Sequence, residues 1–287
     1  MTQEIIQMLL SDKEIETGRF YFSNCSLLTR IEIPSSVTSL ESKAFYECSL
    51  LENVQIPSSV TSIGNYAFYG CVSITQITIP ASVTEIGDHV FCGCTKLAKV
   101  SILSSITSIK NGSFFGCYSL TNFTIPPSVT SIGENAFFGC TSLTEISIPP
   151  SVTSIGKSAF HGCSDLKEIS IPPLIDSINK YTFHNCTRLQ KIQIPSSVKY
   201  IGERAFSCCS SLKIVTIPES VTRICDYAFY ECDNLRRITI PSSVKSIGEC
   251  AFSKCSRMAQ AKLESSSTVI GKKAFPNGLS ILKGDPE

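Results

Sequence analysis

The sequence contains no tryptophan, only three histidines, and few charged residues for its length of 287. Charged residues make up 17% of the chain, against roughly 25% in an average soluble domain. The net charge is +1, which excludes a general electrostatic attraction to nucleic acid or to an anionic membrane. No apolar run approaches the ~18 residues that a membrane span requires. We therefore expect a soluble chain without a membrane span.

The first sixteen residues, MTQEIIQMLLSDKEIE, also lack the features of a secretory signal. Such a signal has a basic region before its apolar stretch and a cleavage site of small residues after it. Here acidic residues flank the apolar positions instead. The sequence thus gives no indication of export by this route.

A fixed step of 23 residues organises the chain. Phenylalanine recurs at this step twelve times, from Phe22 to Phe275. Eleven of the fifteen cysteines keep the same step, at positions 25, 48, 71, 94, 117, 140, 163, 186, 209, 232 and 255. A constant period of 20–29 residues indicates a solenoid of leucine-rich-type coils. No coil of this kind buries its apolar face alone, so stacking on its neighbours must stabilise it.

One unit, residues 51–71, reads LENVQIPSSVTSIGNYAFYGC. Its first half has the leucine-rich signature, with Leu51, Val54 and Ile56 as the inward residues of a short strand. Pro57 ends this strand because proline has no N–H to donate to the next coil. Stacked units would place these strands in a parallel sheet with a spacing of about 4.8 Å.

The second half of the unit returns the chain to the start of the next coil. Val60 and Ile63 are expected to point into the core from an extended segment. Gly64 is expected in a turn that requires an unusual φ. The segment through Ala67 and Phe68 is expected to form a single 3₁₀ or helical turn, because side chains three residues apart then share a face.

The cysteine column is interpreted as a ladder of buried thiols. Stacked equivalents would keep their Cβ atoms farther apart than the roughly 3.5–4.5 Å of a disulfide, and a free cysteine behaves as a small buried hydrophobe. Four cysteines lie outside the column, at positions 92, 208, 225 and 250. None has the partners at the spacing of a zinc site, so we expect no metal and no cofactor.

Both ends of the repeat array differ from its middle, because an open solenoid exposes its core at each end. Residues 1–27 are predicted to form an N-terminal cap with a partial coil, including a short helix over residues 3–12. Residues 28–257 are predicted to form ten regular repeats. Residues 258–287 are predicted to form a degenerate terminal repeat and a tail.

The unit C-x-x-L-x-x-I-x-I-P-x-x-V-x-x-I-G-x-x-A-F resembles the BspA-type leucine-rich repeat, over residues 18 to about 282. The chain departs from the pattern at Leu103, which replaces the proline, and at Lys110, Asn179 and Cys225, which replace the glycine. The resemblance implies a leucine-rich repeat solenoid with a parallel β-sheet on its concave face. It also implies an adhesion-type surface protein that recognises a host or neighbouring-cell macromolecule.

Candidate catalytic groups are few. His161 and His184 occupy the same place in adjacent units, a place that elsewhere holds tyrosine or phenylalanine. They are interpreted as members of a stacked aromatic ladder, with a two-histidine metal contact or pH-sensitive spot as the alternative. Neither a Ser-His-Asp arrangement nor a glycine-rich phosphate loop is indicated. We therefore expect a binding protein and not an enzyme.

The outward strand positions differ in charge between the two halves of the chain. The first six strands carry two basic and three acidic residues there, and the last five carry six basic and one acidic. The six basic residues, here called the basic stripe, are Lys167, Lys191, Lys213, Arg236, Arg237 and Lys262. They are interpreted either as a solvated face or as a docking surface for an acidic protein or glycan. Without interleaved aromatic residues, nucleic-acid binding is not expected.

Localisation stays open between two hypotheses. The resemblance favours the cell surface and an extracellular host protein as partner. The missing signal and the unpaired cysteines favour the cytoplasm, where the chain would be a scaffold for protein–protein interaction. Four potential N-glycosylation sites, at Asn24, Asn111, Asn122 and Asn185, would carry glycans only on a secretory route. We expect a monomer or a weak homo-oligomer formed through the terminal coil.

Overall fold

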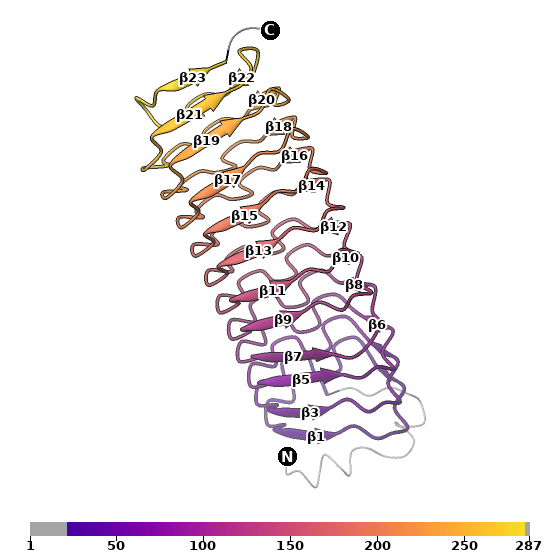
Figure 1. Cartoon of the computed structure of the whole chain (residues 1–287). Helices are drawn as coiled ribbons and strands as arrows, with labels where there is room; N and C mark the ends of the chain where they lie inside the picture. The colour runs from indigo at the N-terminus through magenta and orange to yellow at the C-terminus, as the bar shows by residue number, and fades with distance from the viewer. Residues whose placement is uncertain (1–21, 285–287) are drawn as a thin grey trace.

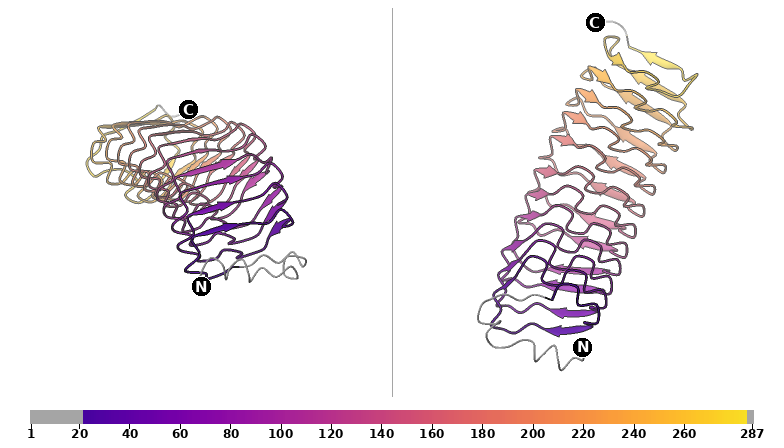
Figure 2. Two further views of the ribbon diagram at one scale, coloured as in Figure 1. Left: turned by 90° about the horizontal axis from the view of Figure 1, so that it is seen from below. Right: turned by 180° about the vertical axis from the view of Figure 1, so that it is seen from behind.

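The computed structural model describes residues 22–284, which form one parallel β-solenoid (Figure 1). Each 23-residue coil contributes one longer strand and one two-residue strand, on different sides of the coil. The stack is not straight, since the far coils are displaced from the near ones in the view from below (Figure 2). The predicted helix over residues 3–12, and most of the predicted cap at residues 1–27, lie outside the described residues. The fold class is confirmed.

The longer strands have three or four residues and form the face that we call the strand face. Their bounds are β1 Arg30–Glu32, β3 Asn53–Gln55, β5 Gln76–Ile79, β7 Lys99–Ile102, β9 Asn122–Thr124, β11 Glu145–Ser147, β13 Glu168–Ser170, β15 Lys191–Gln193, β17 Ile214–Thr216, β19 Arg237–Ile240, β21 Gln260–Leu263 and β23 Ile281–Lys283. In the unit at residues 51–71 the strand begins at Asn53, two residues after Leu51, which was predicted to be its first inward residue.

The two-residue strands belong to the extended return, and the sequence pattern did not identify them as strands. Their bounds are β2 Ser39–Leu40, β4 Ser62–Ile63, β6 Glu85–Ile86, β8 Ser108–Ile109, β10 Ser131–Ile132, β12 Ser154–Ile155, β14 Ser177–Ile178, β16 Tyr200–Ile201, β18 Arg223–Ile224, β20 Ser246–Ile247 and β22 Val269–Ile270. The predicted inward residues of this segment, such as Val60 and Ile63, are buried.

Residues that share a place in the unit form straight rows. In the long-strand ladder Arg30 pairs with Asn53, and in the short-strand ladder Ser62 pairs with Glu85, each across one step of 23. The last coil is the exception, because β23 pairs with β21 at a step of 20, from Ala261 to Ile281.

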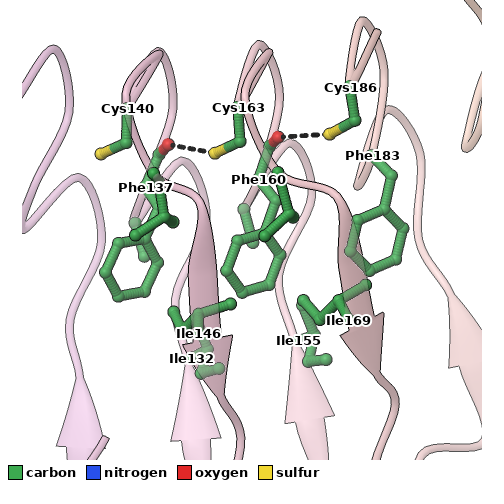
Figure 3. Packing of buried hydrophobic residues seen from close by; sticks show 14 of the residues in the cluster. Ile132, Phe137, Cys140, Ile146, Ile155, Phe160, Cys163, Ile169, Phe183 and Cys186 are labelled. Carbon is green, nitrogen blue, oxygen red and sulfur yellow. Dashed lines mark hydrogen bonds between the residues drawn. The ribbon is translucent and has the colours of Figure 1, made fainter. Parts of the chain in front are cut away.

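Stacked phenylalanines run through the core. Phe137, Phe160 and Phe183 are buried, and their rings stack at centroid distances of 5.4 and 5.6 Å with interplanar angles of 3° (Figure 3). Equivalent stacking extends from Phe22 on Phe45 to Phe252 on Phe275. The row of rings is continuous through every described coil, so the aromatic repeat of the sequence becomes one unbroken core.

The prediction for Gly64 was wrong in its physical reason. Its φ is not among the positive values of the chain. A Cβ atom on Gly64 would instead lie 2.5 Å from the backbone nitrogen of Ser42 on the preceding coil. The glycine is required because two coils approach closely, and not because the turn is left-handed.

In two of the coils where another residue replaces this glycine, the short-strand ladder is interrupted. In the described chain β8, which precedes Lys110, does not pair with β6, and β14, which precedes Asn179, does not pair with β12. The side-chain amide of Asn179 donates to the carbonyl oxygen of Ile155 at 2.7 Å, whereas Gly156 uses its own N–H to reach Ile132. At Cys225 the backbone bond to Ile201 is kept, at 2.9 Å.

The segment through Ala67 and Phe68 is a series of tight turns, and no residue of 22–284 is helical. Residues 43 and 47, and their equivalents in later coils as far as Lys273 and Lys254, adopt φ between 52° and 75°. Left-handed residues interrupt a right-handed helix, which explains why the predicted 3₁₀ or helical turn does not form. We call these segments, residues 64–71 and their equivalents, the turn face.

Candidate functional site

All six residues of the basic stripe are exposed on the strand face or at its edge. Inward and outward residues alternate along each strand, as in β15, where Ile192 is buried between exposed Lys191 and Gln193. The alternation follows from the pleat of a β-strand. The six stripe residues are thus accessible to solvent, while their role in binding remains a prediction.

The stripe spans five consecutive coils but does not form a single row. Lys167, Lys213 and Arg236 lie just before β13, β17 and β19. Lys191 and Arg237 are the first residues of β15 and β19, and Lys262 is the third residue of β21. The backbone N–H of Lys213 donates to Gln190, and that of Gln190 donates to Lys167. Neighbouring places are thus one strand spacing apart, about 4.8 Å.

Most of the stripe is free of ion pairs. Among residues 22–284, only Lys262 of the six has a carboxylate within 4.0 Å, that of Glu264 at 3.6 Å. The other ion pairs of the described chain join adjacent coils elsewhere, for example Lys180 with Glu203 at 2.8 Å. Even Glu168, which pairs in register with Lys191, forms no ion pair with it. The unpaired cations outnumber the carboxylates at this end of the strand face and give it a net positive charge.

Beside the stripe the strand face is hollowed. A depression of about 500 Å³ extends over β9, β11, β13 and β15. Its lining residues are Asn122, Phe123, Thr124, Glu145, Ile146, Ser147, Ile148, Glu168, Ile169, Ser170, Lys191 and Gln193. The lining combines exposed polar residues, such as Glu145 and Ser147, with buried apolar residues, such as Ile146. One residue of the stripe, Lys191, forms part of the wall.

Sequence reasoning missed this hollow. It spans the place where β11 and β13 are not hydrogen-bonded to each other, and the shape of a sheet at such a break is not encoded in the repeat pattern. The small residues Thr124, Ser147 and Ser170 occupy one outward place on three of these coils, but the same place is also small elsewhere, as at Thr78 and Thr216, and so does not mark the hollow.

One apolar side chain is exposed among the cations. Ile214, the first residue of β17, is 66% exposed. It pairs in register with Lys191 on β15 and follows Lys213 in the chain. Arg237 occupies the same place on β19, one step of 23 later. The residues at the same place as Ile214 on the other described coils are all polar or charged, from Arg30 to Gln260.

The repeat pattern of BspA type leucine rich repeat regions matches the chain in six copies, over residues 13–144, 107–224 and 176–283. The chain belongs to the BspA-type leucine-rich repeat family. This confirms the family that the sequence resembles.

Solved structures agree with this assignment. A leucine-rich repeat protein of Bacteroides ovatus is 27% identical, with a TM-score of 0.54, over 92% of this chain and 86% of that one. The leucine-rich repeat protein of T. pallidum is 29% identical, with a TM-score of 0.51, over 64% and 78%. The pneumococcal vaccine antigen PcpA shares the fold at 20% identity, with a TM-score of 0.59 over 84% and 69%. No curated protein sequence matches the chain.

The histidines of this BspA-type chain lie on the turn face, away from the strand face. His161 stacks on Phe138 at 4.2 Å, as predicted for an aromatic ladder, but His184 meets His161 edge-on, at 4.7 Å and 68°. Burial lowers the pKa of His161 to about 4, and the neighbouring imidazole of His184 adds to the lowering. Burial also lowers the pKa of His184. Both rings are therefore neutral near pH 7.

The cysteine column is buried except for the half-buried Cys25, and all fifteen cysteines are free thiols. Burial raises the pKa of Cys48 to about 12, and it raises the pKa of Cys163 and Cys186 well above the usual range. The prediction of a buried thiol ladder is confirmed. These thiols are unreactive, because the thiolate is the nucleophile and the metal ligand.

Residues 22–284 contain no group of three or more His, Cys, Asp or Glu side chains that could hold a metal ion. The same range contains no helix that is long and apolar enough to cross a bilayer. The four potential glycosylation sites are all exposed. Asn122 lies in the wall of the hollow, where a glycan would obstruct a partner.

Proposed function

We propose that this BspA-type chain is a non-enzymatic recognition protein of the adhesion type, which binds a host or neighbouring-cell macromolecule through its strand face. The observation that carries the proposal is the set of five exposed basic residues without ion pairs on four successive coils, from Lys167 to Arg237. Solvent-exposed charges of one sign raise the association rate of an oppositely charged partner. A partner with an acidic surface fits this face.

The charges of the turn face have a different arrangement. There Lys157, Lys180 and Lys254 each form an ion pair with a glutamate on a neighbouring coil, and Lys110, which has no ion pair in the described chain, lies seven coils away from Lys272 and Lys273, which also have none. Paired charges cancel each other at a distance and give little attraction to a partner. This contrast supports the strand face as the docking surface.

The test compares charge reversals on the two faces. Arg236→Glu with Arg237→Glu should strongly reduce binding of poly-L-glutamate and of heparin, and should remove most of the salt dependence of binding. The matched control is Lys272→Glu with Lys273→Glu, two adjacent exposed residues on the turn face. Equal binding by the two double variants would contradict the proposal.

A second candidate function, an intracellular scaffold, is supported by the fifteen free thiols, since unpaired cysteines are typical of reducing compartments. The two candidates differ in where the protein is found. Protease treatment of intact cells should remove an adhesion-type surface protein and should leave an intracellular scaffold untouched.

A further inference from the structure

We infer that the partner is an acidic protein segment that places an apolar side chain on Ile214. The inference rests on the proposed function, because it specifies the chemistry of the partner at the same face. On the strand face, the large aliphatic side chain of Ile214 is 66% exposed at a place that holds a polar or charged residue in every other described coil.

The surroundings of Ile214 match the usual anatomy of a binding hot spot. Such a spot has an apolar centre that a partner desolvates, with charged or polar residues around it that exclude water. Lys191 and Arg237 occupy the same place as Ile214 on the coils before and after it. Lys213 directly precedes Ile214 at the start of β17, and Arg236 directly precedes Arg237 at the start of β19. Cations thus lie on both sides of Ile214 along the stack and at the start of its own strand.

The spacing suggests how a partner would meet this centre. Lys191 and Arg237 are two coils apart, which is about 9.6 Å at the usual strand spacing, and the hydrogen-bonded ladder is interrupted between β17 and β19. In an extended segment, an apolar residue shares one face with the residues two positions before and after it, and carboxylates at those two positions span about 13 Å. The long side chains of the cations on either side of Ile214 reach carboxylates at that separation. The segment would run along the stack, across the strands.

The same observations disfavour an acidic glycan. Sulfate and carboxylate groups would satisfy the cations, but a glycan gains nothing from an isoleucine at their centre. None of the predicted outward positions of the strand face carries an aromatic side chain on which a sugar ring could stack. Burial of an aliphatic side chain is favourable only against another apolar group.

The test uses three probes on the whole chain: poly-L-glutamate, a random copolymer of glutamate and tyrosine of matched length, and heparin. The copolymer should bind more tightly than poly-L-glutamate. Ile214→Thr keeps a β-branched residue in the strand and should weaken copolymer binding about thirtyfold, the loss that corresponds to a hot spot. Binding of poly-L-glutamate and heparin should not change.

The matched control is Val269→Thr in β22, since Val269 is 67% exposed but lies on the return side of its coil. It should change the binding of none of the three probes. Equal binding of both polypeptides, equal loss in both isoleucine and valine variants, or tightest binding of heparin would overturn the inference. In each of these cases a loss of binding on reversal of Arg236 and Arg237 would leave the proposed function standing.

Discussion

The thiol of Cys163 donates a hydrogen bond of 3.2 Å to the carbonyl oxygen of Phe137, 26 residues earlier in the chain (Figure 3). The same bond recurs in coil after coil, for example from Cys186 to Phe160. A buried carbonyl oxygen has two lone pairs, and the backbone N–H of Cys140 occupies only one of those on Phe137. The cysteine column therefore links each coil to the one before it.

This arrangement predicts protection of the thiols from alkylation. Treatment of the native protein with iodoacetamide near pH 8 should modify at most the three half-buried cysteines, Cys25, Cys208 and Cys225. The column is inaccessible, and burial raises the pKa of its thiols, so little thiolate exists. After denaturation all fifteen should react. Mass spectrometry of the intact protein counts the modified thiols. Rapid native labelling of Cys140 or Cys163 would contradict the buried ladder.

The phenylalanine row is expected to carry much of the stability of the stack. Phe160→Ala removes a fully buried ring between two stacked neighbours and should lower the free energy of unfolding by about 3–5 kcal/mol. Urea unfolding followed by circular dichroism measures the loss. Tyr118→Ala is the control, because Tyr118 is 52% exposed and its loss should cost no more than about 0.5 kcal/mol. Similar midpoints for the two variants would show that the row is not the core.

Adjacent coils approach closely at the repeat glycines, so a side chain added there should disturb the stack locally. A Cβ atom on Gly156 would lie 2.5 Å from the backbone nitrogen of Glu134, so Gly156→Ala should separate these coils and cost about 1–3 kcal/mol. Hydrogen exchange should quicken at the N–H of residue 156, which is bonded to Ile132. Lys110→Ala is the control, because this position already carries a side chain. It should change neither stability nor exchange at β10 and β12.

The sequence predicted the period, the parallel ladder and the buried thiols, because each depends only on which residues share a place in the unit. It did not predict the short strands, since two residues such as Ser62 and Ile63 leave no pattern of their own. It assigned the wrong reason to Gly64, because close approach of two coils and a left-handed φ both require glycine. The hollow beside Lys191 spans an interruption between β11 and β13, and no single unit predicts where along the stack such an interruption occurs.

Acid should weaken the stack at the paired histidines. Burial holds the pKa of His161 at about 4 in the folded protein, below about 6.5 in an unfolded chain, so the unfolded state binds the proton first as pH falls. The contribution to stability is complete above pH ~6.5 and is lost as the pH falls toward 4. His161→Phe, which continues the ring of Phe138, should flatten this dependence. The urea midpoint as a function of pH measures it, with Tyr69→Phe in the same place of an earlier coil as control. An unchanged slope in His161→Phe would contradict the assignment.

The most direct test of recognition through the strand face is a footprint of lysine acetylation with and without bound poly-L-glutamate, read by mass spectrometry of peptides. Lys167, Lys191 and Lys213 should become several-fold less reactive when the polymer is bound. Lys110 and Lys272, which are exposed on the turn face, should react at the same rate in both samples. Protection of the turn-face lysines, or equal protection of all five, would contradict docking on the strand face.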